Sequence, residues 1–125
     1  MHKLVLIAMG GLLGTLSRYA LSTWVDERSH SSFPYGTMAV NLAGCFAAGF
    51  LFPLLERAAV SPDLRLGVFT GFLGGFTTFS AYGLQTIVLA QGSMWSLATV
   101  NVLVSNVVGL VMVWMGGSLS RSLVQ

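Results

Sequence analysis

The stretch Gly74-Gly75-Phe76-Thr77-Thr78-Phe79-Ser80-Ala81-Tyr82-Gly83 lies within residues 66 to 120, a run that contains no Asp, Glu, Lys or Arg. A charge-free run of this length predicts two membrane spans, because one helix needs roughly 20 apolar residues to cross the hydrocarbon. The glycines and hydroxyl residues of the stretch predict a break in a helix at membrane depth. Non-helical backbone persists there only where protein buries it or where it lines a watery cavity. The break is therefore the first place to look for function.

The composition is that of an integral membrane protein. Of the 125 residues, 54% are hydrophobic and 8% are charged, whereas soluble domains carry roughly 25% charged residues. The net charge of +2 comes from few groups. No basic cluster could follow a phosphate backbone, so no nucleic-acid partner is predicted. The single cysteine, Cys45, has no partner for an internal disulfide and is interpreted as a small hydrophobe.

The sequence predicts one membrane domain over residues 1–125 with four spans, at about residues 4–24, 36–55, 66–90 and 95–118. Lys3 and the apolar run after it also resemble a secretory signal peptide. Arg18 falls where a cleavage region would lie, so the segment is interpreted as the first span. Four short helices enclose little room, and a polar path through them is expected to need a second subunit.

The basic residues give a weak indication of orientation. Four spans place both termini on one side of the membrane, together with the loop between the second and third spans. Four basic residues fall on that side and two on the other: Lys3, Arg57, Arg65 and Arg121 against Arg18 and Arg28. Basic residues favour the cytoplasmic side, but this ratio is compatible with either a fixed or a dual orientation.

The predicted break has two interpretations. Gly74-Gly75 is expected to end one half-helix, and Thr77, Thr78 and Ser80 carry hydroxyls that can cap the next. Such a break presents carbonyls, which bind cations, and N–H groups, which favour anions. The alternative is a glycine kink whose hydroxyls bond back to their own helix.

Two aromatic residues follow the break. Phe79 and Tyr82 are three residues apart and share one helix face. They are either packing groups or, through the positive edges of their rings, contacts for an anion.

Polar side chains recur inside the other spans. They are amides and hydroxyls: Thr37, Asn41, Asn101, Ser105 and Asn106. Each either bonds a neighbouring helix or lines a path in which N–H and O–H groups replace the water around a small anion. Arg18 is the only permanent charge well inside a span. It either extends to the interface or raises the anion concentration at a pore mouth.

Several functional classes lack their essential groups. No Asp or Glu lies in a predicted membrane segment, so a proton-coupled exporter has no buried carboxylate. His2 and His30 lie outside the spans and have no metal-ligand spacing. No phosphate-binding loop or nucleophile–base pair indicates an enzyme.

The motifs together resemble one family. Gly74-Gly75-Phe76-Thr77-Thr78-Phe79-Ser80 resembles the GGxTTFS signature of the Fluc (CrcB) fluoride channels. The resemblance extends along the chain through Gly14-x-x-x-Arg18-Tyr19, Gly36-Thr37-x-x-x-Asn41-Leu42-x-Gly44 and Asn106-x-x-Gly109. It implies an all-α membrane protein of four transmembrane helices per subunit, with the third helix broken at Gly74–Thr78. It further implies an antiparallel dual-topology dimer that exports fluoride passively across the inner membrane and so limits fluoride toxicity.

The resemblance also implies a set of site residues. A structural Na⁺ would lie on the dimer axis, held by the backbone carbonyls of Gly74 and Thr77. The fluoride pore would take its amides, ring edges, hydroxyls and vestibule charge from Asn41, Asn106, Phe79, Tyr82, Thr37, Thr78, Ser80 and Arg18.

The chain departs from the family pattern at four positions. Tyr82 replaces a second Phe, Gly83 removes a hydroxyl, Gln85 stands where Glu is common, and Leu110 stands where Ser is common. Since Tyr keeps the aromatic edge, Tyr82→Phe is expected to retain transport. Two alternatives to a homodimeric channel stay open. One is a non-conducting partner subunit of a paired, heteromeric channel, and the other is a small multidrug-type exporter.

Overall fold

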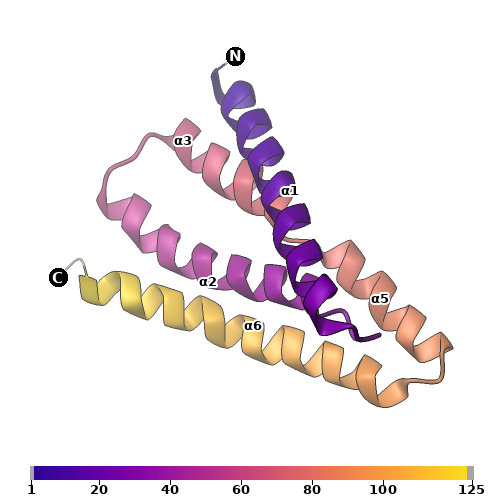
Figure 1. The fold of residues 1–125 in the computed structure, drawn as a ribbon. Coiled ribbons are helices and arrows are strands. Elements are labelled where there is room, and N and C mark those ends of the chain that lie inside the picture. Colours follow the sequence, from indigo (N-terminus) through magenta and orange to yellow (C-terminus); the bar gives the residue numbers. More distant parts are fainter. Residues whose placement is uncertain (1, 124–125) are drawn as a thin grey trace.

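The computed structural model describes residues 2–123, which form helices and no strand (Figure 1). The predicted all-α class is confirmed. Residues 1, 124 and 125 of the predicted domain lie outside the described residues. Within this described part of the chain, three helices are long and apolar enough to cross a membrane. They are α1 (His2–Ser29), α2 (Tyr35–Arg57) and α6 (Trp95–Leu123).

The predicted third span, residues 66–90, is divided among four shorter segments. They are α3 (Pro62–Leu66), the π-helical η1 (Gly67–Leu73), α4 (Gly74–Phe76) and α5 (Phe79–Gln91). Between α4 and α5 the backbone of Thr77 and Thr78 is extended, with φ/ψ of −81°/157° and −149°/108°. The first half of this region therefore ends at Phe76, and the second begins at Phe79.

One boundary was predicted wrongly. Gly74-Gly75 does not end the first half-helix, because both residues are still helical. Gly75 serves a packing function instead. A Cβ on Gly75 would lie 2.6 Å from the carbonyl oxygen of Gly11 in α1. The helix ends one residue after Gly75, at Phe76, where side chains can satisfy the backbone groups that a break exposes.

The small residues bring α1 against η1 and α4. A Cβ on Gly71 would lie 2.7 Å from the Ile7 carbonyl oxygen, and one on Gly14 would collide with the Phe72 carbonyl oxygen. Helix backbones come this close only when one of them carries no side chain at the contact. These glycines therefore allow close helix packing within one subunit.

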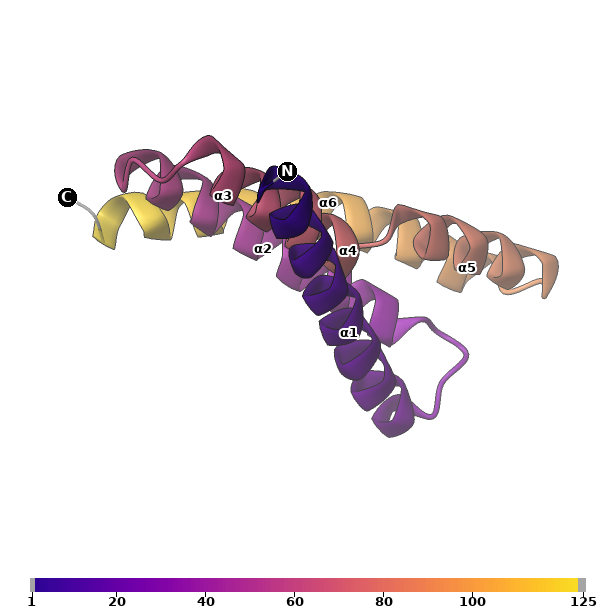
Figure 2. The same ribbon diagram turned by 90° about the horizontal axis from the view of Figure 1, so that it is seen from above.

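The elements form a fork (Figure 1). α2 and α6 run parallel side by side, and α1 with η1 and α4 forms a second arm that leaves them at an angle (Figure 2). α5 continues from the break along the first half of α6. The Asp26 carboxylate of α1 accepts a hydrogen bond from Gly36 N at 2.8 Å, which fixes the start of α2.

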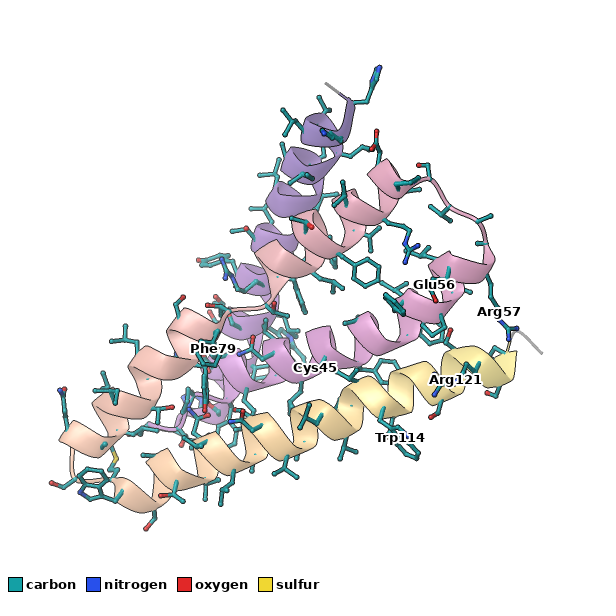
Figure 3. The ribbon with its side chains drawn as sticks, turned by 180° about the vertical axis from the view of Figure 1, so that it is seen from behind. Cys45, Glu56, Arg57, Phe79, Trp114 and Arg121 are labelled. Atoms are coloured by element: carbon teal, nitrogen blue, oxygen red, sulfur yellow. The ribbon has the colours of Figure 1, made fainter. Side chains whose placement is uncertain are left out.

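Few side chains are buried within the single chain. The buried hydrophobic residues are Phe33, Val40, Leu73, Phe76, Leu89 and Ala98. Large apolar side chains cover the outside of α1 and α6 and are exposed. Phe79, at the start of α5 and inside the fork, is 80% exposed (Figure 3). The molecule is therefore shaped to contact lipid or another chain over most of its surface.

Candidate functional site

The side chain of Asn41 in α2 pairs with the extended backbone at the break between α4 and α5. Its Nδ2 donates to the Thr78 carbonyl at 3.0 Å, and its Oδ1 accepts from Thr78 N at 2.8 Å. An extended residue cannot use helical partners, and unpaired backbone groups in a membrane cost several kcal/mol each. The Asn41 amide supplies both missing partners. This pairing joins residues 37 positions apart.

The hydroxyls at the break divide between the two predicted roles. Thr78 caps α5, since its Oγ1 accepts from Ala81 N at 3.2 Å. Thr77 instead bonds back, with Oγ1 donating to the Leu73 carbonyl at 2.9 Å. Ser80 Oγ lies 3.2 Å from Thr78 Oγ1. The capping prediction is confirmed for Thr78, whereas Thr77 follows the alternative.

These caps free two backbone carbonyls. In a continuous helix Thr78 N would donate to the Gly74 carbonyl and Ala81 N to the Thr77 carbonyl. Here Thr78 N donates to Asn41, and Ala81 N donates to the Thr78 side chain. Gly74 and Thr77 therefore lose the helical donors of their carbonyls, and Gly74 lies exposed on the subunit surface.

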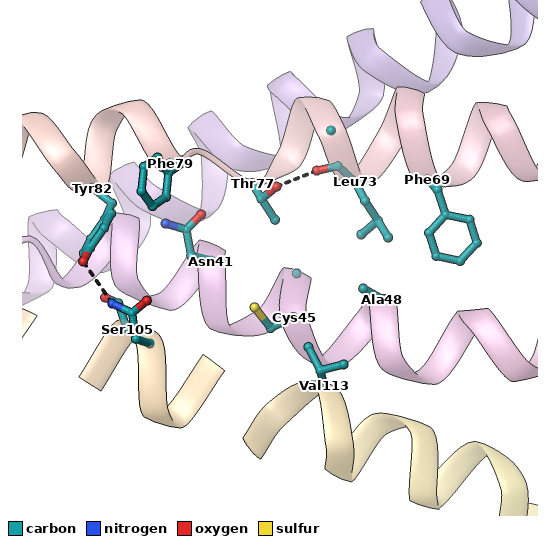
Figure 4. A pocket seen from close by; sticks show the side chains of 13 residues that line it. Asn41, Cys45, Ala48, Phe69, Leu73, Thr77, Phe79, Tyr82, Ser105 and Val113 are labelled. Atoms are coloured by element: carbon teal, nitrogen blue, oxygen red, sulfur yellow. Dashed lines mark hydrogen bonds between the residues drawn. The ribbon is translucent and has the colours of Figure 1, made fainter. Parts of the chain in front are cut away.

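A cavity of about 480 Å³ opens on one side of the break (Figure 4). We call it the aromatic cavity. It is lined by four of the predicted pore residues, Asn41, Phe79, Tyr82 and Asn106. Gly74 and Thr77, whose carbonyls were predicted to bind Na⁺, also line it. The centroids of the Phe79 and Tyr82 rings are 5.3 Å apart, so the two rings share a face as predicted.

A second cavity of about 450 Å³ contains the other four predicted pore residues, Arg18, Thr37, Thr78 and Ser80. We call it the hydroxyl cavity. The Arg18 guanidinium is partly buried, and its Nη1 lies 3.5 Å from the Thr77 carbonyl oxygen. Arg18 therefore faces the break. Asn41 lines the aromatic cavity and Thr78 the hydroxyl cavity, so their hydrogen-bonded pair lies between the two.

A polar network ties α5 to α6 beside the aromatic cavity. Asn101 is 2% exposed, and its Nδ2 donates to Thr86 Oγ1 at 2.8 Å. Thr86 in turn donates to the Tyr82 carbonyl at 2.8 Å, and Ser105 Oγ lies 3.4 Å from Asn101 Oδ1. For Asn101 the helix-bonding interpretation is therefore the correct one. Thr86 was missed by the sequence analysis, although its position four residues after Tyr82 was an available signal.

Acidic, histidine and cysteine side chains do not form a metal centre. Within residues 2–123 no group of three or more of them could hold a metal ion. A cation at this site would be held by backbone carbonyls or by side-chain amide and hydroxyl oxygens. The carbonyls of Gly74 and Thr77, which have lost their helical donors, are oxygen ligands of the kind that a hard cation such as Na⁺ prefers.

A helical membrane protein with a side-chain-stabilised break is the class that this geometry defines. Comparison with known proteins identifies the family. The family model described as "CrcB-like protein, Camphor Resistance (CrcB)" matches residues 5–117. The chain belongs to this family.

Curated relatives match over nearly their whole length. A protein of Desulforapulum autotrophicum is 50% identical over 109 residues, which are 86% of this chain and 87% of the relative. One of Nitratidesulfovibrio vulgaris is 43% identical over 122 residues, covering 97% and 98% of the two chains. One of Geotalea uraniireducens is 44% identical over 124 residues, covering 98% and 100%. Each of the three is named fluoride-specific ion channel FluC.

Proposed function

We propose that this protein is a fluoride-selective channel through which F⁻ leaves the cell passively across the inner membrane, limiting its toxicity in the cytoplasm. The observation that carries the proposal is the pair of cavities that meet at the Asn41–Thr78 bond. All eight residues predicted to line a fluoride path border one cavity or the other. The similarity to proteins named as fluoride channels supports the same conclusion.

The chemistry of the two cavities suits a small anion. Arg18 in the hydroxyl cavity raises the local anion concentration, and the hydroxyls of Thr37 and Ser80 replace hydration water. In the aromatic cavity the ring edges of Phe79 and Tyr82 continue the path. Among the described residues 2–123, no carboxylate lines either cavity. That favours an anion channel over a proton-coupled exporter.

The proposed assembly is an antiparallel dimer of four-span subunits. In each subunit α3, η1, α4 and α5 together would form the third span. The 80% exposed Phe79 ring supports this proposal, because an aromatic group inside the fork gains a partner when a second copy covers it. A homologous subunit of different sequence could take the second place, and the alternative of a partner subunit then applies.

A structural Na⁺ at the dimer axis belongs to the same proposal. Gly74 and Thr77 would hold it through their carbonyl oxygens, and the symmetry-related chain would provide two more. Such an ion would neutralise the carbonyl dipoles that meet where two breaks cross. The loss of the helical donor at both carbonyls is the feature that supports it, and the Thr77 carbonyl also accepts a long hydrogen bond from Arg18 Nη1 at 3.5 Å.

The test uses the purified chain alone in liposomes loaded with fluoride or with chloride. We expect rapid fluoride release and retained chloride, because closely spaced small donors without a wide pore favour the smaller, more strongly hydrated anion. Comparable release of both anions contradicts fluoride selectivity. Release of neither anion by the chain alone, with fluoride release restored by a homologous subunit, favours the heteromeric alternative.

A further inference from the structure

The hydroxyl of Tyr82 has a specific neighbour on α6. Asn106 Nδ2 donates to Tyr82 Oη at 3.0 Å and to the Val102 carbonyl of its own helix at 2.8 Å. Because a carbonyl can only accept, the contact with Val102 fixes which end of the Asn106 amide faces Tyr82. An amide nitrogen carries two hydrogens. Both hydrogens of Asn106 are therefore in use.

This arrangement gives the two residues different capacities toward an anion. Asn106 has no N–H left to donate, and only its carbonyl oxygen stays available. Tyr82 Oη accepts the hydrogen bond from Asn106 with a lone pair, so the Tyr82 O–H is still available to donate. Among residues 2–123 no hydrogen bond is found in which the Tyr82 hydroxyl donates. Accepting one hydrogen bond also polarises a hydroxyl and strengthens it as a donor.

The position of this O–H matters as much as its availability. Tyr82 lines the aromatic cavity together with Asn41, Thr77 and Phe79. An O–H on the Tyr82 ring places a strong donor in this cavity, beside the weak ones that the ring edges offer.

We propose that the Tyr82 O–H, oriented and polarised by Asn106, is a hydrogen-bond donor that binds fluoride in the aromatic cavity. The inference rests on the proposed channel function and deepens it. Fluoride contacts Tyr82 directly, and Asn106 acts through Tyr82 as a positioning residue. The role predicted for Asn106 from sequence, a donor to the ion, is replaced by this indirect one.

The test measures initial fluoride efflux from liposomes over a series of internal fluoride concentrations. Tyr82→Phe keeps the ring and removes only the donor, so transport persists while the half-saturating fluoride concentration rises about 3- to 10-fold, the factor for one net hydrogen bond. Asn106→Leu raises that concentration less, because the hydroxyl stays but loses its orientation. The double variant matches Tyr82→Phe alone, since both changes act through one O–H.

Tyr35→Phe is the matched control. It removes the same hydroxyl from a ring that borders neither cavity, and it leaves the half-saturating concentration unchanged. An unchanged concentration in Tyr82→Phe, or shifts that add in the double variant, overturns the inference and leaves the channel function standing. A parent protein that releases no fluoride overturns the proposed function and this inference with it.

Discussion

At the scale of single residues, the Asn41 amide takes the place of hydrogen bonds that Thr78 cannot make while its backbone is extended. The same side chain borders the aromatic cavity. Of its two Nδ2 hydrogens, one reaches the Thr78 carbonyl and the second is left for the cavity. Asn41 thus has both a structural function and a proposed function at the ion path.

Asn41→Asp keeps the shape of the side chain but replaces its N–H groups by a second oxygen. A carboxylate can still accept from Thr78 N but can no longer donate to the Thr78 carbonyl, and it repels an anion. We expect fluoride efflux from liposomes to fall by about 10-fold or more, a loss on the order of one charged-group hydrogen bond. Size-exclusion chromatography is expected to show the same oligomer as the parent. Loss of the oligomer would instead assign Asn41 to holding the helices together.

At the scale of elements, the glycines of α1 set the position of the break. Gly14 faces the Phe72 carbonyl without room for a Cβ. Gly83 in α5 has no heavy atom within 4 Å of the place where its Cβ would lie. The two glycines therefore have opposite tolerance for the same change.

Gly14→Ala is expected to destabilise the protein by about 1–3 kcal/mol, because the α1 backbone must move away from η1 and α4. Gly83→Ala is expected to be neutral or stabilising by about 0.5–1 kcal/mol, since alanine is the better helix former. Thermal unfolding in detergent measures both. Equal midpoints for the two variants would contradict the close approach of α1 to the break.

At the scale of the whole molecule, the freed carbonyls and the exposed Phe79 ring lie on surfaces that one chain leaves open. In the proposed dimer they meet their symmetry mates. A cation bound there stabilises only the assembled protein, so its effect on unfolding grows with its concentration.

The unfolding midpoint of the parent is therefore expected to be higher in Na⁺ than in a large organic cation at equal ionic strength. Thr77→Ala keeps that difference, because it removes a hydroxyl and retains the carbonyl. Gly74→Pro abolishes it, because proline removes the N–H that Gly74 donates to the Phe69 carbonyl and so distorts the backbone of the site. A parent insensitive to Na⁺ would argue against the axial ion.

Sequence patterns predicted the parts of this structure that depend on local chemistry. Apolar runs located α1, α2 and α6, and the threonines after Gly74-Gly75 located the interruption to within a few residues. The prediction that Gly74-Gly75 ends the first half-helix was wrong. Gly75 is required for packing against Gly11 of α1, about 60 residues away in the chain, and the local sequence does not show that contact. The pairs Asn41–Thr78 and Tyr82–Asn106 likewise depend on tertiary contacts. The family resemblance indicated which residues belong to the site. It could not indicate which of their N–H and O–H groups already donate hydrogen bonds within the protein.

The exposure of Phe79 has a consequence for how activity scales with abundance. For the proposed dimer, a chain diluted in lipid keeps this ring against acyl chains, and lipid competes with the partner for the same surface. Activity per chain should then climb with the protein-to-lipid ratio and level off once encounters are frequent. A cell making few copies would gain less than proportional protection. A dominant-negative chain, able to pair but unable to conduct, would silence working copies in proportion to its own dose.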